Sequence, residues 1–180
     1  MGRVFSKVGL TMANLSLVYF LEYTITTSFT VANAQQIINL DSKREDEFVY
    51  ENAFIIFNLC YQFGVFISRS SLSFVKIKRV WMITIAQGIL FTFYMLNATV
   101  FFCHNIYVLF FMMIFVGLMG GAQFVNVIYL IKQSDKLHKN DKELALNMTS
   151  MCNDAGILLA SILSLVLSLT AFAKYDTSDD

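Results

Sequence analysis

Five long apolar segments decide what this chain can fold into. They cover approximately 8–31, 50–68, 80–98, 106–131 and 144–172. A helix of about 20 apolar residues is long enough to cross the hydrocarbon core of a bilayer. Composition agrees, because 57% of the 180 residues are hydrophobic and only 14% are charged, against about 25% charged residues in soluble domains. We therefore predict an all-α integral membrane protein, with residues 1–180 forming a single membrane domain of five transmembrane helices.

The fifth segment is predicted to form one long, tilted helix. Its 29 residues would extend about 43 Å at 1.5 Å per residue, which is too short for two spans and a turn. The chain contains no proline. Any bend in a span must therefore come from glycine or from packed polar side chains.

Basic residues predict how the spans are oriented. Five spans place the N-terminal lead and the connections after the second and fourth spans on one side of the membrane. These regions contain ten of the thirteen basic residues: Arg3, Lys7, Arg69, Lys76, Lys78, Arg79, Lys132, Lys136, Lys139 and Lys142. Lysine and arginine are enriched on the cytosolic side of membrane proteins. We expect a cytosolic N-terminus, with the acidic tail from residue 174 on the opposite side.

Glu22 lies near the middle of the first span, within the stretch "LVYFLEYTI". A charged carboxylate at the centre of a bilayer costs on the order of 2.5–3.5 kcal/mol. At 100° per residue, Thr11, Tyr19 and Thr26 lie on the same side of the helix as Glu22. This pattern favours a polar face that lines a wet interior, with Glu22 at a cavity for a substrate or a proton. The alternative is a structural acid that is hydrogen-bonded to a neighbouring helix.

The fifth span repeats this pattern around Asp154. Five polar residues lie on the same side of the helix as Asp154, namely Asn147, Ser150, Ser161, Ser164 and Ser168. The serines are compatible with simple hydrogen bonds between helices. Asp154 is equally compatible with a place in the cavity and with a structural role near the cytosolic end.

The fourth span contains "GLMGGAQFVN". Gly117 and Gly121 form a G-x-x-x-G pair, and together with Gly120 they predict a close approach of two helix backbones. This glycine cluster is not a nucleotide-binding loop, because it lies inside an apolar helix with no preceding strand. Asn126 follows on the same helix, and we expect it to contact a ligand or to satisfy a neighbouring helix.

The second span ends in "YQFGVFISRSSL". Gly64 and Ser68 are small enough to permit a close crossing, and Arg69 leads into a basic turn. An arginine at this position can bond the last carbonyls of its helix. Taken alone, these residues predict an ordinary cytosolic turn.

Four stretches together resemble the C-terminal half of the battenin family of lysosomal membrane proteins. In order along the chain they are "NLSLVYFLEY", "YQFGVFISRSSL", "GLMGGAQFVN" and "CNDAGI". The resemblance implies a fold similar to that of major facilitator transporters, with six helices in the first half and five in the second. It also implies a lysosomal, late endosomal or vacuolar membrane with the C-terminus in the lumen. The implied role is export of glycerophosphodiesters, with effects on lysosomal pH and on basic amino acids.

The resemblance also suggests roles for individual residues. Glu22, Arg69, Asn126 and Asp154 match positions that the family tends to keep, whereas Val116 stands where the family tends to have a carboxylate. We hypothesise that Glu22, with Tyr19 and Tyr23 nearby, lines the central cavity. There it would exchange a proton or hold a cationic residue of the other half. Gln62 and Asn126 would offer hydrogen bonds to the substrate. Gly64, Ser68 and Arg69 would serve a cytosolic gate.

The resemblance covers only the second half of such a transporter, so the N-terminal half is absent from this chain. The expected partners are the lipid bilayer, the missing half or a second chain, and a small polar, glycerophosphodiester-like substrate. No cofactor, metal ion or nucleic acid is expected. No enzymatic activity is expected either, because His104 and His138 lie in loops on opposite sides. The alternative function is a non-transporting scaffold for endosome–lysosome trafficking, which would use residues 132–143.

Overall fold

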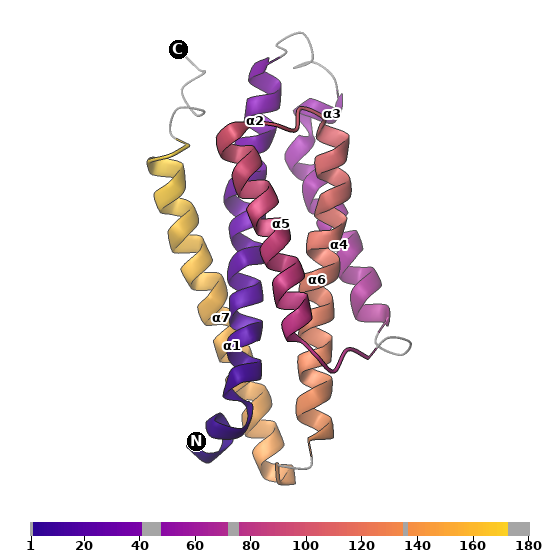
Figure 1. Ribbon diagram of the computed structural model, residues 1–180, viewed down its shortest axis with the longest axis vertical. Helices are drawn as coiled ribbons and strands as arrows, with labels where there is room; N and C mark the ends of the chain where they lie inside the picture. Colours follow the sequence, from indigo (N-terminus) through magenta and orange to yellow (C-terminus); the bar gives the residue numbers. More distant parts are fainter. Residues whose placement is uncertain (1, 41–47, 72–75, 135–136, 173–180) are drawn as a thin grey trace.

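The computed structural model describes residues 2–40, 48–71, 76–134 and 137–172, and within these ranges the chain is helical without strands. The elements follow one another along the chain as long helices that lie side by side (Figure 1). They are α1 (Gly2–Thr24), a π-helical segment (Ile25–Phe29), α2 (Thr30–Leu40), α3 (Phe48–Glu51), α4 (Ala53–Ser70), α5 (Trp81–Val100), α6 (Ile106–Gln133) and α7 (Lys139–Leu169).

Five of these helical stretches are long and apolar enough to cross a membrane, which confirms the predicted fold class. The fifth is a single helix, as expected. The first is longer than predicted, because α1, the π segment and α2 run continuously to Leu40 rather than ending near residue 31. Its last turns are held by amides that bond the end of α5. Asn97 donates to Asn33 over 2.7 Å, and Gln36 donates to the carbonyl of Ala98 over 2.7 Å.

The described basic regions share one end of the bundle (Figure 1). The connection from α4 to α5 and the connection from α6 to α7 both lie at this end, as does the N-terminus. We call it the basic end and the opposite one the far end. The side chains of Arg3 and Lys7, Lys136, the acidic connection 41–47 and the tail from residue 173 lie outside the described residues.

Threonine hydroxyls accompany the π segment that interrupts the first helix. Thr24 donates to the carbonyl of Phe20, and Thr27 donates to that of Tyr23. Thr30 bonds the carbonyl of Ile25, five residues back, through both its backbone N–H and its hydroxyl. Hydroxyls that bond backbone carbonyls compete with regular helix geometry. The sequence "TITTSFT" therefore offers a physical reason for the change of register, without a proline.

The interior contains two apolar clusters, one toward each end. The cluster toward the far end includes Phe57, Tyr94 and Leu109, and the cluster toward the basic end includes Met12 and Ile131. Along the sequence, the polar residues near the middle of the spans lie between residues of these two clusters. Buried polar groups require hydrogen-bond partners, so the contacts of these polar residues need a functional explanation.

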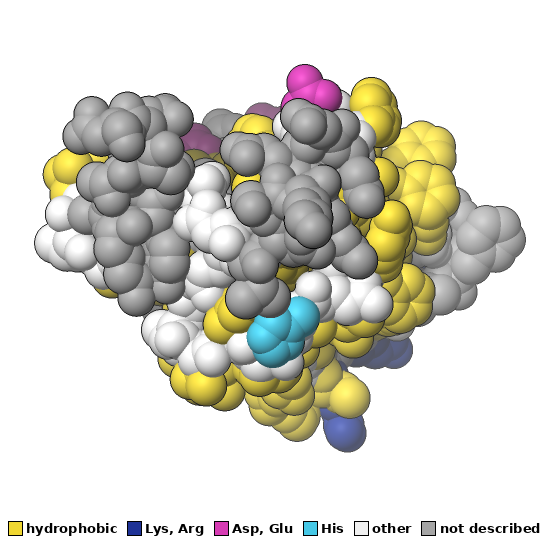
Figure 2. Space-filling view, turned by 90° about the horizontal axis from the view of Figure 1, so that it is seen from above, with side chains coloured by type: hydrophobic (Ala, Val, Ile, Leu, Met, Phe, Trp, Pro, Cys, Tyr) yellow, Lys and Arg dark blue, Asp and Glu magenta, His cyan; other side chains and the backbone are white. Residues whose placement is uncertain are grey.

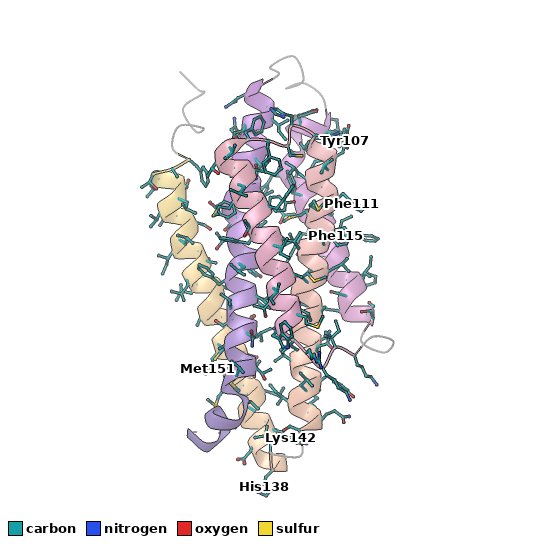
Figure 3. All side chains as sticks on the ribbon, viewed as in Figure 1. Tyr107, Phe111, Phe115, His138, Lys142 and Met151 are labelled. Atoms are coloured by element: carbon teal, nitrogen blue, oxygen red, sulfur yellow. The ribbon has the colours of Figure 1, made fainter. Side chains whose placement is uncertain are left out.

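The flanks of the bundle are apolar. Tyr107, Phe111 and Phe115 are 59%, 57% and 38% exposed and point away from the bundle along one edge of α6 (Figure 3). Figure 2, which looks onto the far end, shows hydrophobic side chains along the flank. An apolar exterior of this kind implies a lipid environment.

Candidate functional site

Glu22 is sealed at the meeting point of three helices. Its side chain is 1% exposed. Its carboxylate lies directly over Gly120 of α6, where any Cβ would collide with it. The phenol of Tyr61, on α4, lies close to the carboxylate, while Oε2 has no hydrogen-bond partner among the described residues. The bundle therefore accommodates an acid at mid-span by leaving out one side chain and supplying one phenol.

Aromatic rings continue from Glu22 to a guanidinium. Tyr19 and Tyr23 stack with centroids 6.1 Å apart and ring planes 19° apart. Tyr19 lies close to Arg69, whose guanidinium carbon is 5.0 Å from the ring centroid of Phe124. The charge of Arg69 is also close enough to act on the Glu22 carboxylate. We call Tyr19, Glu22, Tyr23, Tyr61 and Arg69 the Glu22 cluster.

Small residues bring α4 and α6 together beside this cluster. A Cβ added at Gly117 would meet the backbone of Tyr61, and one added at Gly64 would meet the backbone of Ile114. A Cβ added at Gly121 would meet the hydroxyl of Ser68, which is buried and donates to the carbonyl of Val65 over 3.0 Å. Two pairs of small residues four apart thus face each other across the crossing, as in other close membrane-helix contacts.

The remaining predicted site residues lie around the Glu22 cluster: Gln62 shares a groove with Arg69, and Asp154 is close enough to Tyr23 for its charge to act there. Asn126 is buried, and both ends of its amide are in use. Its Oδ1 accepts from the backbone N–H of Ile77 over 2.7 Å, and its Nδ2 donates to the carbonyl of Ala122 over 2.8 Å. Gln62 is exposed on α4 and Asp154 is exposed on α7. Asn126 therefore anchors the α4–α5 connection in this structure.

The linings of four cavities and grooves among the described residues do not include Glu22. Gln62 and Arg69 line a shallow groove on α4 together with Val65, Phe66 and Ser70. Of the predicted polar stripe of the first span, Tyr19 and Glu22 are packed inside this bundle, 5% and 1% exposed, whereas Thr11 and Thr26 are half-buried. The cavity role of Glu22 stays a prediction about the assembled protein.

Three residues of the arrangement were not singled out from the sequence. Tyr61 and Phe124 stand in the stretches "YQFG" and "AQFV", where they are ordinary apolar-face aromatics by pattern. Gly156 of α7 lies against the carbonyl of Ser16, so it sets the crossing of α1 and α7. Its only signal in the sequence was a small residue inside an apolar helix. Pairing across helices is not visible in helical periodicity alone.

The described residues can exchange a proton or respond to charge, since a carboxyl, three phenols and a guanidinium are linked across α1 and α4. Together with the five apolar helices, this arrangement defines a multi-span membrane bundle with an acid in its interior. The family model described as "CLN3 protein" matches residues 4–172, and the chain belongs to that family.

Similar proteins are found in distant organisms. Battenin of Dictyostelium discoideum is 43% identical over 161 residues, which are 89% of this chain and 37% of that protein. Protein BTN1 of Yarrowia lipolytica is 32% identical over 168 residues, 93% of this chain and 40% of its own length. Battenin of Canis lupus familiaris is 30% identical over 155 residues, 85% of this chain and 33% of its own. The chain thus spans less than half the length of these relatives. No solved structure matches it.

Proposed function

We propose that this chain is the second membrane bundle of a battenin-like transporter, in which two bundles of the major facilitator type enclose a central cavity. Family membership and five spans support this proposal. The cargo class is glycerophosphodiesters, as the family resemblance implies, with consequences for lysosomal pH and basic amino acids. The membrane is lysosomal, late endosomal or vacuolar, with the basic end in the cytosol, as the positive-inside rule requires.

The face for the other bundle includes α7. Only 11% of the residues in its most apolar stretch are buried inside this bundle. Its exposed residues include a polar series, Asn147, Ser150, Asp154 and Ser161. Polar side chains inside a membrane span face protein or a water-filled cavity rather than lipid. We infer that this stripe of α7 faces the second bundle, with Asp154 beside the substrate path.

Glu22 acts in this proposal as a proton carrier whose charge state is tied to helix position. The carboxyl lies against Gly120 and close to Tyr61, so water would reach it only when α1 moves away from α6. An ionised carboxylate is stabilised by water, whereas a neutral acid is tolerated in the closed contact. Loss or gain of the proton therefore shifts the equilibrium between closed and open arrangements. The single observation that carries this proposal is the sealed contact between Glu22 and Gly120.

Arg69 connects this acid to the basic end. It reaches Tyr19 on α1 and Phe124 on α6 from the last turn of α4. Movement of α1 would separate Tyr19 from Arg69 and alter the electrostatic field of Arg69 at Glu22. Arg69 thus serves as the gate residue, and the gate and the proton site are coupled through one tyrosine.

A chimera tests the proposal. In it, residues 10–172 of this chain replace the matching part of Dictyostelium discoideum battenin, and lysosomal vesicles are assayed for glycerophosphocholine transport. Glu22→Gln keeps size and hydrogen bonding but cannot ionise, so we expect transport to fall more than tenfold at unchanged protein level. The matched control is Glu51→Gln, an exposed acid at the end of α3, for which transport should stay within twofold.

Undiminished transport by the Glu22→Gln chimera, at equal abundance, would refute the proton-carrier role. A chimera that supports trafficking but moves no substrate even with Glu22 intact would favour the scaffold alternative. In that case, replacing residues 132–143 with a neutral linker should abolish trafficking.

A further inference from the structure

A small cavity lies between the first helix and α7, one to three turns beyond Glu22 toward the far end. Its volume is about 120 Å³, which is room for several water-sized groups. The first helix contributes the π segment and the start of α2, and α7 lies beside it (Figure 1). The lining residues are Thr27, Ser28, Val31, Ala32, Gln35, Ser168 and Phe172.

Ser28 is the distinctive group of this cavity. Its side chain is 5% exposed, and its hydroxyl has no hydrogen-bond partner among the described residues. A buried hydroxyl without a partner costs free energy, and a serine hydroxyl rotates to meet an acceptor or donor that is offered. Ser168 from α7 and the amide of Gln35 flank the same space. The cavity therefore presents two hydroxyls and one carboxamide from both of its walls.

Among the residues that the structure describes, the lining has no charged side chain. These residues offer no cation to an anion and no carboxylate to a metal ion. Two backbone carbonyls that the π segment could have offered to a cation are already bonded. Tyr23 O accepts from the hydroxyls of Thr26 and Thr27, and Ile25 O accepts from Thr30. What is left is a neutral set of donors and acceptors with the apolar walls of Val31 and Ala32.

We propose that this cavity binds a neutral polyhydroxyl group of about the size of glycerol. Its hydroxyls would pair with Ser28, Ser168 and Gln35, and its carbon chain would lie on Val31. The side chains would not need to change their protonation state, because hydroxyl and carboxamide groups act as both donors and acceptors. The site is separate from the Glu22 cluster, and its occupancy does not depend on whether the chain transports.

Saturation-transfer NMR on the full chain in lipid nanodiscs tests this inference, with empty nanodiscs as background. The probe is glycerol, and 1-propanol is the comparison because it has the same carbon skeleton with a single hydroxyl. We expect a signal for glycerol at least fivefold above that for 1-propanol. Ser28→Val should remove this excess. Thr26→Val is the matched control, because Thr26 is two residues away and does not line the cavity, and it should retain the signal.

A second variant covers the possibility that Ser28→Val disturbs folding. Val31 is 46% exposed at the cavity wall, so Val31→Phe should fill the space while every hydroxyl remains, and it should also abolish the glycerol signal. Equal signals for glycerol and 1-propanol would overturn the proposal. So would a glycerol signal that survives both variants, or a loss of signal as large in Thr26→Val as in Ser28→Val.

Discussion

Helices α6 and α7 are similar in length and apolarity but have opposite places in the bundle. In the most apolar stretch of α6, 44% of the residues are buried inside the bundle, whereas in that of α7 the share is 11%. Three glycines of α6 let α4 and Glu22 approach its backbone, while α7 approaches α1 at Gly156 and the π segment through one hydroxyl pair. Hydropathy therefore identifies a span, whereas the distribution of small residues decides which span lies at the centre. Helix α7 keeps a polar face that no other helix of this bundle covers among the described residues.

The largest effect is expected at the backbone crossing of α4 and α6. Gly117→Val places a side chain against the carbonyl of Tyr61 and the N–H of Val65, and neither backbone group can move aside. We expect the free energy of unfolding to fall by more than about 3 kcal/mol, beyond the usual range for overpacking. The variant should then lose its monodisperse peak in size-exclusion chromatography. Gly88→Val is the control, since nothing lies within 4 Å of its Cβ position. Equal destabilisation by both variants would contradict the close contact of α4 and α6 at this crossing.

The next effect tests the contact between Glu22 and Gly120. Gly120→Ala should destabilise the protein by about 1–3 kcal/mol, because its Cβ would displace the carboxylate. In a Glu22→Ala background the same change should cost nothing, or stabilise slightly, since alanine favours a helix over glycine. Unfolding in sodium dodecyl sulfate gives the four free energies of this double-mutant cycle. A coupling energy within error of zero would show that the two residues do not touch.

A smaller effect is expected at the anchor of the α4–α5 connection. Asn126→Ala leaves the N–H of Ile77 without its acceptor, which should cost about 1–2 kcal/mol and accelerate cleavage of the connection by trypsin. Asn58→Ala is the control, because the side chain of Asn58 bonds only the carbonyl of Phe54 in its own helix. Equal cleavage rates in the two variants would contradict the anchoring role of Asn126.

The smallest effect belongs to the pair of α1 and α7. The hydroxyls of Thr27 and Ser164 lie 2.6 Å apart, and hydrogen bonds between membrane helices contribute about 0.6 kcal/mol on average. A double-mutant cycle of Thr27→Val and Ser164→Ala should return a coupling energy of that size. A coupling energy above that of the Glu22–Gly120 pair would show that the contact made by α7 is stronger than the contact made by α6, contrary to expectation.

The sequence predicted the fold class well, because length and apolarity are sufficient to count spans. It also indicated close packing at Gly117 and Gly121, because a pair of glycines four apart has few other uses in an apolar helix. The end of the first span was wrong, since Asn33 and Gln36 look like loop residues until their bonds to α5 are seen. The π segment was not anticipated, because helical periodicity assumes a constant register.

The surroundings of Glu22 were the least predictable part. A helical wheel places Tyr19 and Glu22 on one polar face, but it cannot say that Gly120, 98 residues further along the chain, will press against that face. Tyr61 was hidden for the same reason. Contacts between helices depend on which small residue meets which large one, and a single sequence does not record that pairing.

The proton-carrier role of Glu22 is tested most directly by infrared difference spectroscopy of the Dictyostelium discoideum chimera in membranes, recorded with and without glycerophosphocholine. Substrate should change the carbonyl stretch of a protonated carboxylic acid, and this change should disappear in Glu22→Gln but persist in Glu51→Gln. A difference spectrum in that region that is the same with glutamate or glutamine at position 22 would contradict this role.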